Sequence, residues 1–211
     1  PLTSIMGYSD LLINGAFSKQ NKKTTEVIKK IQVVAQNMIR KVNDFLDVTQ
    51  FQLGKNPVSL KPEVELVPIL EEIVKELNFV AQNNEVSLKF KKPDKNFEIP
   101  ADREKLKAAL FNVVDNSIKY APKGSVNIKI QDGGTLKIII TDTGIGMTPE
   151  KLKTLFEVMF ERDEKAKEVA EGKGMGLYLA TQIIKAHNGK IWAESAGEGK
   201  GSTFYVELPI S

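Results

Sequence analysis

The chain of 211 residues is 41% hydrophobic and 27% charged, a composition typical of a soluble globular protein with one large core, or one domain plus an appendage. Its 30 basic and 27 acidic residues are mixed along the sequence, so no basic block indicates nucleic-acid binding. With no cysteine and one histidine, the chain lacks disulfides and the ligands of a zinc site. We find no apolar run of membrane-spanning length and no secretory signal pattern.

Residues 1–54 have the pattern of a helical hairpin. A short helix is predicted before Gly15 and a long one over 22–53, with Gly54 as its C-terminal cap. The long helix carries apolar residues at three- and four-residue spacing, beginning at Ile28. Two helices cannot cover so wide an apolar stripe, so we expect a second copy to complete a four-helix bundle. Packing of the stripe on the rest of the same chain is the alternative.

Residues 55–65 contain prolines and little periodicity, and are predicted to be a linker with one short edge strand. The rest of the chain alternates between helical and strand patterns. Helices are expected over 67–81, between Asp102 and Pro122, after Thr148 and over 175–187, and strands over 86–92, 125–132, 135–143, 190–196 and 201–209. The predicted fold class is α+β, with a mixed, mostly antiparallel sheet and helices on one side of it.

The helix expected between Asp102 and Pro122 carries a polar face. At about 100° per residue, Asn112, Asn116 and Lys119 fall within about 60° of one another, opposite the apolar stripe. A solvated face is the simpler interpretation of such a pattern. The loops that follow bear on whether these side chains bind a ligand instead.

Three glycine-rich loops are candidates for ligand contact. In "TDTGIGM" (141–147), Asp142 ends an apolar strand and the glycines permit close backbone approach, although an ordinary turn would look the same. In "GKGMGL" (172–177), three glycines precede a helix whose N-terminal amides can cradle phosphate, but the spacing differs from the dinucleotide fingerprint. Taken alone, "GEGKGSTF" (197–204) indicates a hairpin turn.

The order and spacing of these motifs resemble the catalytic core of the two-component sensor histidine kinases, over essentially all of the chain. "NVVDNSIKYAP" is similar to the N box, "DTGIGM" and "GKGMGL" to the two glycine boxes, "GKGSTF" to the final strand motif, and "PLTSIMGYSDLL" to the end of the phosphoacceptor box. The resemblance implies a dimerisation and phosphotransfer hairpin over 1–54, a linker over 55–65, and an ATP-binding domain of the Bergerat (GHKL) type over 66–211.

The resemblance also implies roles for individual residues. Asn116 would coordinate Mg²⁺ through its side-chain oxygen, the catalytic Asn112 would support the metal or phosphates, and Lys119 would lie near the phosphates. Asp142 would accept a hydrogen bond from the adenine amino group, supported through water by Thr203. The other residues implied to contact the nucleotide belong to the same motifs: Tyr120, Gly144, Ile145, Gly146, Gly172, Lys173, Gly174, Met175, Gly176 and Leu177.

The implied function is that of a kinase core. A homodimer would bind ATP and Mg²⁺, phosphorylate a histidine and pass the phosphate to an aspartate of a response-regulator receiver domain. It would work in the cytoplasm, and this chain would contact neither nucleic acid nor the membrane. The resemblance places the phosphoacceptor five residues before Pro1, so His187 is expected to be structural.

The amide of Asn112 disfavours the alternative of a GHKL-type ATPase, in which a glutamate activates water. A nucleotide-binding pseudokinase scaffold is a further alternative.

Two positions depart from the family pattern. Lys173 stands where a threonine is usual, and it is expected to point to solvent or to reach a phosphate. In "LFEVMFERDE" the arginine, Arg162, falls one residue late, which leaves the roles of Phe160 and Glu161 open as well. The densely charged segment 161–173 is predicted to form a lid over the nucleotide.

Overall fold

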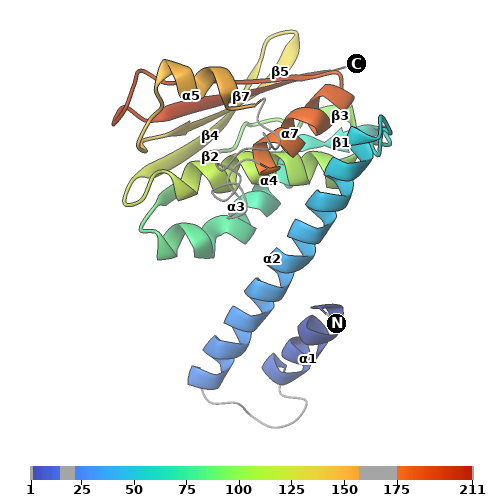
Figure 1. Cartoon of the computed structure of the whole chain (residues 1–211), viewed down its shortest axis with the longest axis vertical. Helices are drawn as coiled ribbons and strands as arrows, with labels where there is room; N and C mark the ends of the chain where they lie inside the picture. The colour runs from blue at the N-terminus through green and yellow to red at the C-terminus, as the bar shows by residue number, and fades with distance from the viewer. Residues whose placement is uncertain (1, 15–21, 157–174, 211) are drawn as a thin grey trace. The chain divides into compact units, whose positions relative to one another are not determined.

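The computed structural model describes residues 2–14, 22–156 and 175–210. By its internal contacts the chain divides into two compact units, Pro1–Lys55 and Asn56–Ser211. Figure 1 labels the helices and strands of both units. No helix in the described ranges combines the length and the hydrophobicity that a membrane span requires.

The first unit is a pair of packed helices, α1 (Leu2–Ile13) and α2 (Lys22–Gln52), which confirms the two helices predicted there. Gln32 Nε2 donates a hydrogen bond to Asp10 Oδ1 at 2.6 Å and so joins them, while Ala35 is buried. Large apolar side chains nevertheless remain exposed along both helices and directly after α2: Ile5, Tyr8, Leu11, Ile31, Val34, Met38, Val42, Phe45, Leu46 and Leu53. The described hairpin therefore leaves most of its apolar stripe uncovered.

The second unit is built on a five-stranded sheet in the order β2-β4-β5-β7-β6. The strands are β2 (Ser87–Lys91), β4 (Ser125–Asp132), β5 (Thr135–Asp142), β6 (Lys190–Glu194) and β7 (Ser202–Pro209). The β2–β4 pairing is parallel and the other three are antiparallel, which confirms the predicted mixed, mostly antiparallel sheet. Gly134, at a φ of 88°, makes the tight β4–β5 turn.

Three helices lie on one side of this sheet (Figure 1): α3 (Leu66–Asn83), α4 (Arg103–Lys119) and α7 (Met175–Ala186). The core lies between them and the inward-facing strand residues, among which Ile138, Ile140 and Val206 have no exposed surface. Burial of each such side chain contributes about 1.5–3 kcal/mol, so this layer contributes a large part of the stability of the second unit. A short helix, α5 (Pro149–Thr154), follows β5.

Local chemistry sets the helix ends. Asp102 caps α4 by accepting a hydrogen bond from the backbone N–H of Lys105 at 3.2 Å, as its position predicts. Pro122 follows the end of α4 and cannot continue it. Thr148 caps α5 and Pro149 is its first residue, which confirms the start predicted at this site.

A second, two-stranded sheet differs from the sequence expectation. Strand β1 (Lys61–Glu65) confirms the short edge strand expected within 55–65, but its antiparallel partner β3 (Glu98–Ala101) was not predicted. The β1 register shifts between Lys61 and Val64, and Glu63 has a φ of 58°, so a bulge interrupts the strand. Only four residues long and containing a proline, β3 carries too little pattern to identify.

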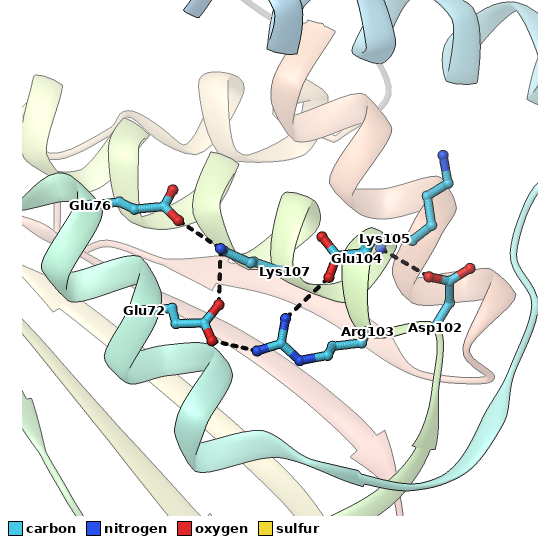
Figure 2. Close-up of polar contacts among 7 residues, drawn as sticks. All are labelled: Glu72, Glu76, Asp102, Arg103, Glu104, Lys105 and Lys107. Atoms are coloured by element: carbon cyan, nitrogen blue, oxygen red, sulfur yellow. Dashed lines mark hydrogen bonds and ion pairs between the residues drawn. The ribbon is translucent and has the colours of Figure 1, made fainter. Parts of the chain in front are cut away.

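Ion pairs join α3 to α4 (Figure 2). Glu72 pairs with both Arg103 and Lys107, Lys107 also reaches Glu76 at 2.6 Å, and Arg103 contacts Glu104 at 3.1 Å. Hydrogen bonds from Lys107 and then Arg103 lower the pKa of Glu72 below its ordinary value. Because most of these side chains are substantially exposed, the network aligns the two helices more than it stabilises them.

The single histidine is a buried structural residue, as expected. His187 is 1% exposed; its Nδ1 donates to the carbonyl oxygen of Ile183 at 2.8 Å and its Nε2 accepts from the backbone N–H of Asp102 at 3.0 Å. Since the Asp102 amide can only donate, the ring is neutral with its proton on Nδ1. His187 thus ties the end of α7 to the start of α4.

Replacing this histidine should destabilise the second unit. His187→Ala leaves the partly buried Asp102 N–H without its acceptor, so we expect the free energy of unfolding to fall by about 1–3 kcal/mol. His187→Gln, which offers an acceptor and a donor, should recover part of that loss. Urea unfolding followed by circular dichroism measures both, with Lys185→Ala on the exposed side of α7 as the control. Equal stability of the alanine variant and the wild type would contradict the structural role.

Candidate functional site

Asp142, the last residue of β5, is a buried carboxylate held in a fixed orientation. It is 5% exposed, and its Oδ1 accepts hydrogen bonds from the backbone N–H groups of Gly144 at 2.8 Å and Ser202 at 3.2 Å. Both bonds end on the same oxygen. Among the described residues, Oδ2 has no hydrogen-bond partner, so it can accept a hydrogen bond from a ligand.

The surroundings of Asp142 change its acidity. Burial raises the pKa of this carboxyl above its ordinary value, and the hydrogen bonds from Gly144 and Ser202 only partly oppose that effect. No described side chain pairs with it as a cation. A carboxylate kept in this state is costly to the fold, which is typical of a group retained for binding or catalysis.

The glycine-rich loop after β5 packs too closely for side chains at two positions. A Cβ at Gly144 would collide with the carbonyl oxygen of Tyr120, and one at Gly146, whose φ is 66°, with that of Gly197. Ile145 N–H also donates to the Tyr120 carbonyl at 3.0 Å. The loop therefore joins the C-terminal end of α4 to the β6–β7 turn, which explains why the motif needs both glycines.

Asn112 on α4 faces the first turn of α7. A Cβ added at Gly176 would lie 3.3 Å from both Cγ and Oδ1 of Asn112, so the glycine makes room for this side chain. The Nδ2 of Asn112 is buried and has no described hydrogen-bond partner. An unpaired buried donor is costly, and an acceptor on a ligand would satisfy it. The N–H groups that open α7 add to the attraction for an anionic acceptor.

The other two residues of the polar face of α4, Asn116 and Lys119, lie closer to the exposed end of the helix. Asn116 is half-buried, and its amide makes no hydrogen bond to a described residue. Lys119 is exposed, with Nζ 5.7 Å from the centre of the Tyr120 ring. Within the described ranges no three His, Cys, Asp or Glu residues gather as a metal site. A divalent cation here would depend on the Asn116 oxygen and on oxygens of the ligand itself, as Mg²⁺ often does.

The structure brings Ser202, not Thr203, to Asp142. In the β5–β7 pairing Asp142 lies opposite Ser202 and Thr141 opposite Thr203, and the two threonine hydroxyls are 3.3 Å apart. Side chains alternate along a strand, so Thr203 lies on the other face of the sheet from Asp142. Ser202 was not predicted from the sequence, although its place at the start of the strand directly after Gly201 is a usable signal.

The remaining predicted residues divide into two groups. Met175, Gly176 and Leu177 open α7, with Leu177 buried, and Ile145 is 55% exposed beside the buried Gly146. The other positions lie outside the described residues, as does the lid predicted over 161–173: Phe160, Glu161, Arg162, Gly172, Lys173 and Gly174.

Comparison with known proteins identifies relatives over the whole chain. Residues 101–211 match the family described as histidine kinase-, DNA gyrase B- and HSP90-like ATPases. The chain is 30% identical to the circadian input-output histidine kinase CikA of Synechococcus elongatus and 29% identical to the sensor histidine kinase WalK of Bacillus subtilis, over 99% of its length in each case. It spans 28% and 34% of those two proteins.

Solved structures share the fold. The histidine kinase AdeS of Acinetobacter baumannii superposes with a TM-score of 0.65 at 18% identity, covering all of this chain and 95% of that one. Full-length ShkA, solved in complex with AMPPNP, superposes with a TM-score of 0.67 at 23% identity, covering 99% of this chain and 43% of that one. At these identities the likeness is one of fold.

The acidity of Asp142 should make stability depend on pH. Its folded-state pKa is raised, so the stability gained from its protonated form is fully present below the unfolded-state pKa and is lost as pH rises through the folded-state value. Asp142→Asn keeps an oxygen acceptor and cannot ionise. As pH rises from the unfolded-state pKa through the raised folded-state pKa, the wild type should therefore lose stability relative to this variant in urea unfolding. Parallel profiles would contradict the raised pKa.

Proposed function

Because the chain belongs to the family of histidine kinase-, DNA gyrase B- and HSP90-like ATPases, we propose that its second unit binds ATP with Mg²⁺ as the kinase core of a sensor histidine kinase. The observation that carries the proposal is the buried Asp142 carboxylate, fixed through one oxygen and leaving the other available. A single acceptor of this kind suits the exocyclic amino group of adenine. Relatives named as histidine kinases along the full chain support the choice.

At the adenine end, Asp142 Oδ2 accepts a hydrogen bond from the amino group. Ser202 replaces Thr203 in supporting the carboxylate, because it lies opposite Asp142 and donates its N–H to it. The exposed Ile145 and the ring of Tyr120 contact the base. The carboxylate offers the ligand only an acceptor, Oδ2. A base with a carbonyl in place of the amino group would place a second acceptor against it, so adenine is preferred over guanine.

At the phosphate end, the unpaired Nδ2 of Asn112 donates to a phosphate oxygen, together with backbone amides at the start of α7. Lys119 adds positive charge. Asn116 supplies an oxygen to Mg²⁺, with the remaining ligands from phosphates and water. The cation, when bound, neutralises charge on the transferring phosphate. We assign Gly172, Lys173 and Gly174 to the same end of the nucleotide.

The side chains favour transfer of phosphate to protein over hydrolysis. The amide of Asn112 cannot accept a proton from water, whereas a kinase needs chiefly position and charge stabilisation. His187 is excluded as the acceptor, because it is buried and both its ring nitrogens are engaged. We propose as phosphoacceptor the histidine that the family resemblance implies five residues before Pro1, from which the phosphate passes to a receiver-domain aspartate.

The first unit serves as the dimerisation and phosphotransfer hairpin. Its exposed apolar stripe supports this role, because a second copy could bury the stripe in a four-helix bundle. Residues 1–54 would then form the hairpin, 55–65 the linker and 66–211 the ATP-binding domain. Such a core works on the cytoplasmic side of the membrane, where ATP is present.

Calorimetric titration with AMPPNP tests the nucleotide site. Asp142→Asn keeps the hydrogen bonds inside the protein but presents an amide to the adenine amino group, so the affinity should fall by about ten- to a hundredfold. Asn116→Ala should remove most of the dependence on Mg²⁺. Asn127→Ala, an exposed amide on β4, is the matched control. Unchanged affinity in Asp142→Asn would remove this residue from the site.

Phosphorylation tests the reaction. A chain extended at its N-terminus to include the expected histidine, incubated with γ-labelled ATP and Mg²⁺, should gain an acid-labile, alkali-stable label of the kind phosphohistidine gives. His187→Gln should keep that label, and replacement of the upstream histidine should abolish it. Release of phosphate without labelling would indicate an ATPase instead, and binding without turnover would indicate a scaffold.

A further inference from the structure

The five-stranded sheet has a second face, turned away from α3, α4 and α7. The cross-strand register defines it, because residues paired directly across strands lie on the same face. Thr141, Thr203 and Glu194 belong to it, whereas Asp142 and Ser202 lie on the face that the helices cover. We call it the open sheet face. It is separate from the nucleotide site.

Positive charge predominates on the open sheet face. It carries five lysines, Lys89, Lys91, Lys129, Lys137 and Lys190, against the two glutamates Glu194 and Glu207. Both glutamates are already engaged: Glu207 pairs with Lys137 at 3.6 Å, and Glu194 accepts a hydrogen bond from the Tyr205 hydroxyl at 3.0 Å. The other four lysines are exposed and form no ion pair with a described residue.

An aromatic pair lies beside these lysines. Trp192 on β6 and Tyr205 on β7 stack with ring centres 5.0 Å apart and planes 10° from parallel, and Lys137 Nζ is 5.2 Å from the indole centre. Both rings are partly exposed. Rings held in place by stacking lose little conformational entropy on binding, and aromatic residues of this kind often anchor protein interfaces.

Protection of the sheet edges does not account for all of these residues. Charged side chains on edge strands prevent aggregation, which explains Lys89 and Lys91 on β2 and Lys190 on β6. Lys129, however, lies on β4, which pairs with β2 on one side and β5 on the other and so is not an edge strand. Partly exposed aromatic rings add nothing to edge protection. An unpaired lysine on an inner strand, together with partly exposed aromatic rings, indicates a surface that binds another molecule.

We propose that the open sheet face docks an acidic segment of a partner protein, with an apolar side chain of that segment against Trp192 and Tyr205. Charge complementarity selects the partner, because four unpaired lysines surround a surface whose own acids are engaged. A nucleic-acid strand is disfavoured, since the indole already stacks on Tyr205 and a base would have to displace part of this arrangement.

The single tryptophan makes the test direct, because the fluorescence of Trp192 reports on this face alone. The intact chain is titrated with a short peptide in which glutamates flank one leucine, and with the same peptide carrying glutamines instead. We expect the acidic peptide to change the fluorescence saturably, with an affinity that weakens as salt is added, and the glutamine peptide to leave it unchanged.

Charge reversal locates the binding. Lys89→Glu combined with Lys129→Glu should weaken the peptide affinity by about five- to tenfold, whereas the matched pair Lys75→Glu and Lys185→Glu, on exposed positions of α3 and α7, should not. Trp192→Ser should weaken binding of a fluorescein-labelled peptide, measured by polarisation. Circular dichroism checks that each variant is folded.

Three outcomes would overturn the proposal. The first is no saturable response to the acidic peptide, and the second is equal weakening by both lysine pairs. The third is tighter binding of oligothymidylate or of phosphatidylglycerol vesicles than of the peptide at the same salt concentration, which would assign the face to a nucleic acid or a lipid surface. AMPPNP affinity, measured in parallel on the Lys89→Glu and Lys129→Glu variant, should be unchanged, because the two sites lie on opposite faces.

Discussion

The candidate site depends on the hydrogen bonds that hold the buried carboxylate of Asp142 in place. One oxygen accepts two backbone N–H groups, from Gly144 and Ser202, and these bonds join the loop after β5 to the start of β7. The two hydrogen bonds offset part of the cost of desolvating this carboxyl, and in the proposed function its second oxygen binds the nucleotide. Stability and binding are therefore opposed at this residue, which is common where a polar group is positioned for function.

Close backbone packing also fixes the position of α4 relative to Asp142. Gly144 meets the Tyr120 carbonyl at the end of α4, and Gly176 makes room for Asn112 in the middle of that helix. At the other end of α4, Asp102 caps the helix and its N–H reaches His187 at the end of α7. The helix with the polar face is thus fixed at both ends and along its length, so its side chains need little reorganisation to meet a ligand.

The two faces of the main sheet differ in what they present. One face packs on the helices and carries Asp142 and Ser202 at its end, while the other presents lysines around a stacked aromatic pair. Strand alternation separates them, since neighbouring residues such as Ser202 and Thr203 point to opposite sides. Binding of a partner on one side and of a nucleotide on the other could therefore occur together without competition for the same side chains.

The sequence by itself determined the helices and strands with clear periodicity, the caps at Asp102 and Thr148, and the candidate set around Asn112 and Asp142, because these depend on local patterns. It did not reveal β3, which is short and contains a proline, or the bulged pairing of β3 with the edge strand β1. It also chose Thr203 where the register selects Ser202. Which face a strand residue occupies, and which oxygen of Asp142 remains free, depend on pairing between segments far apart in the chain, so only the tertiary structure could decide them.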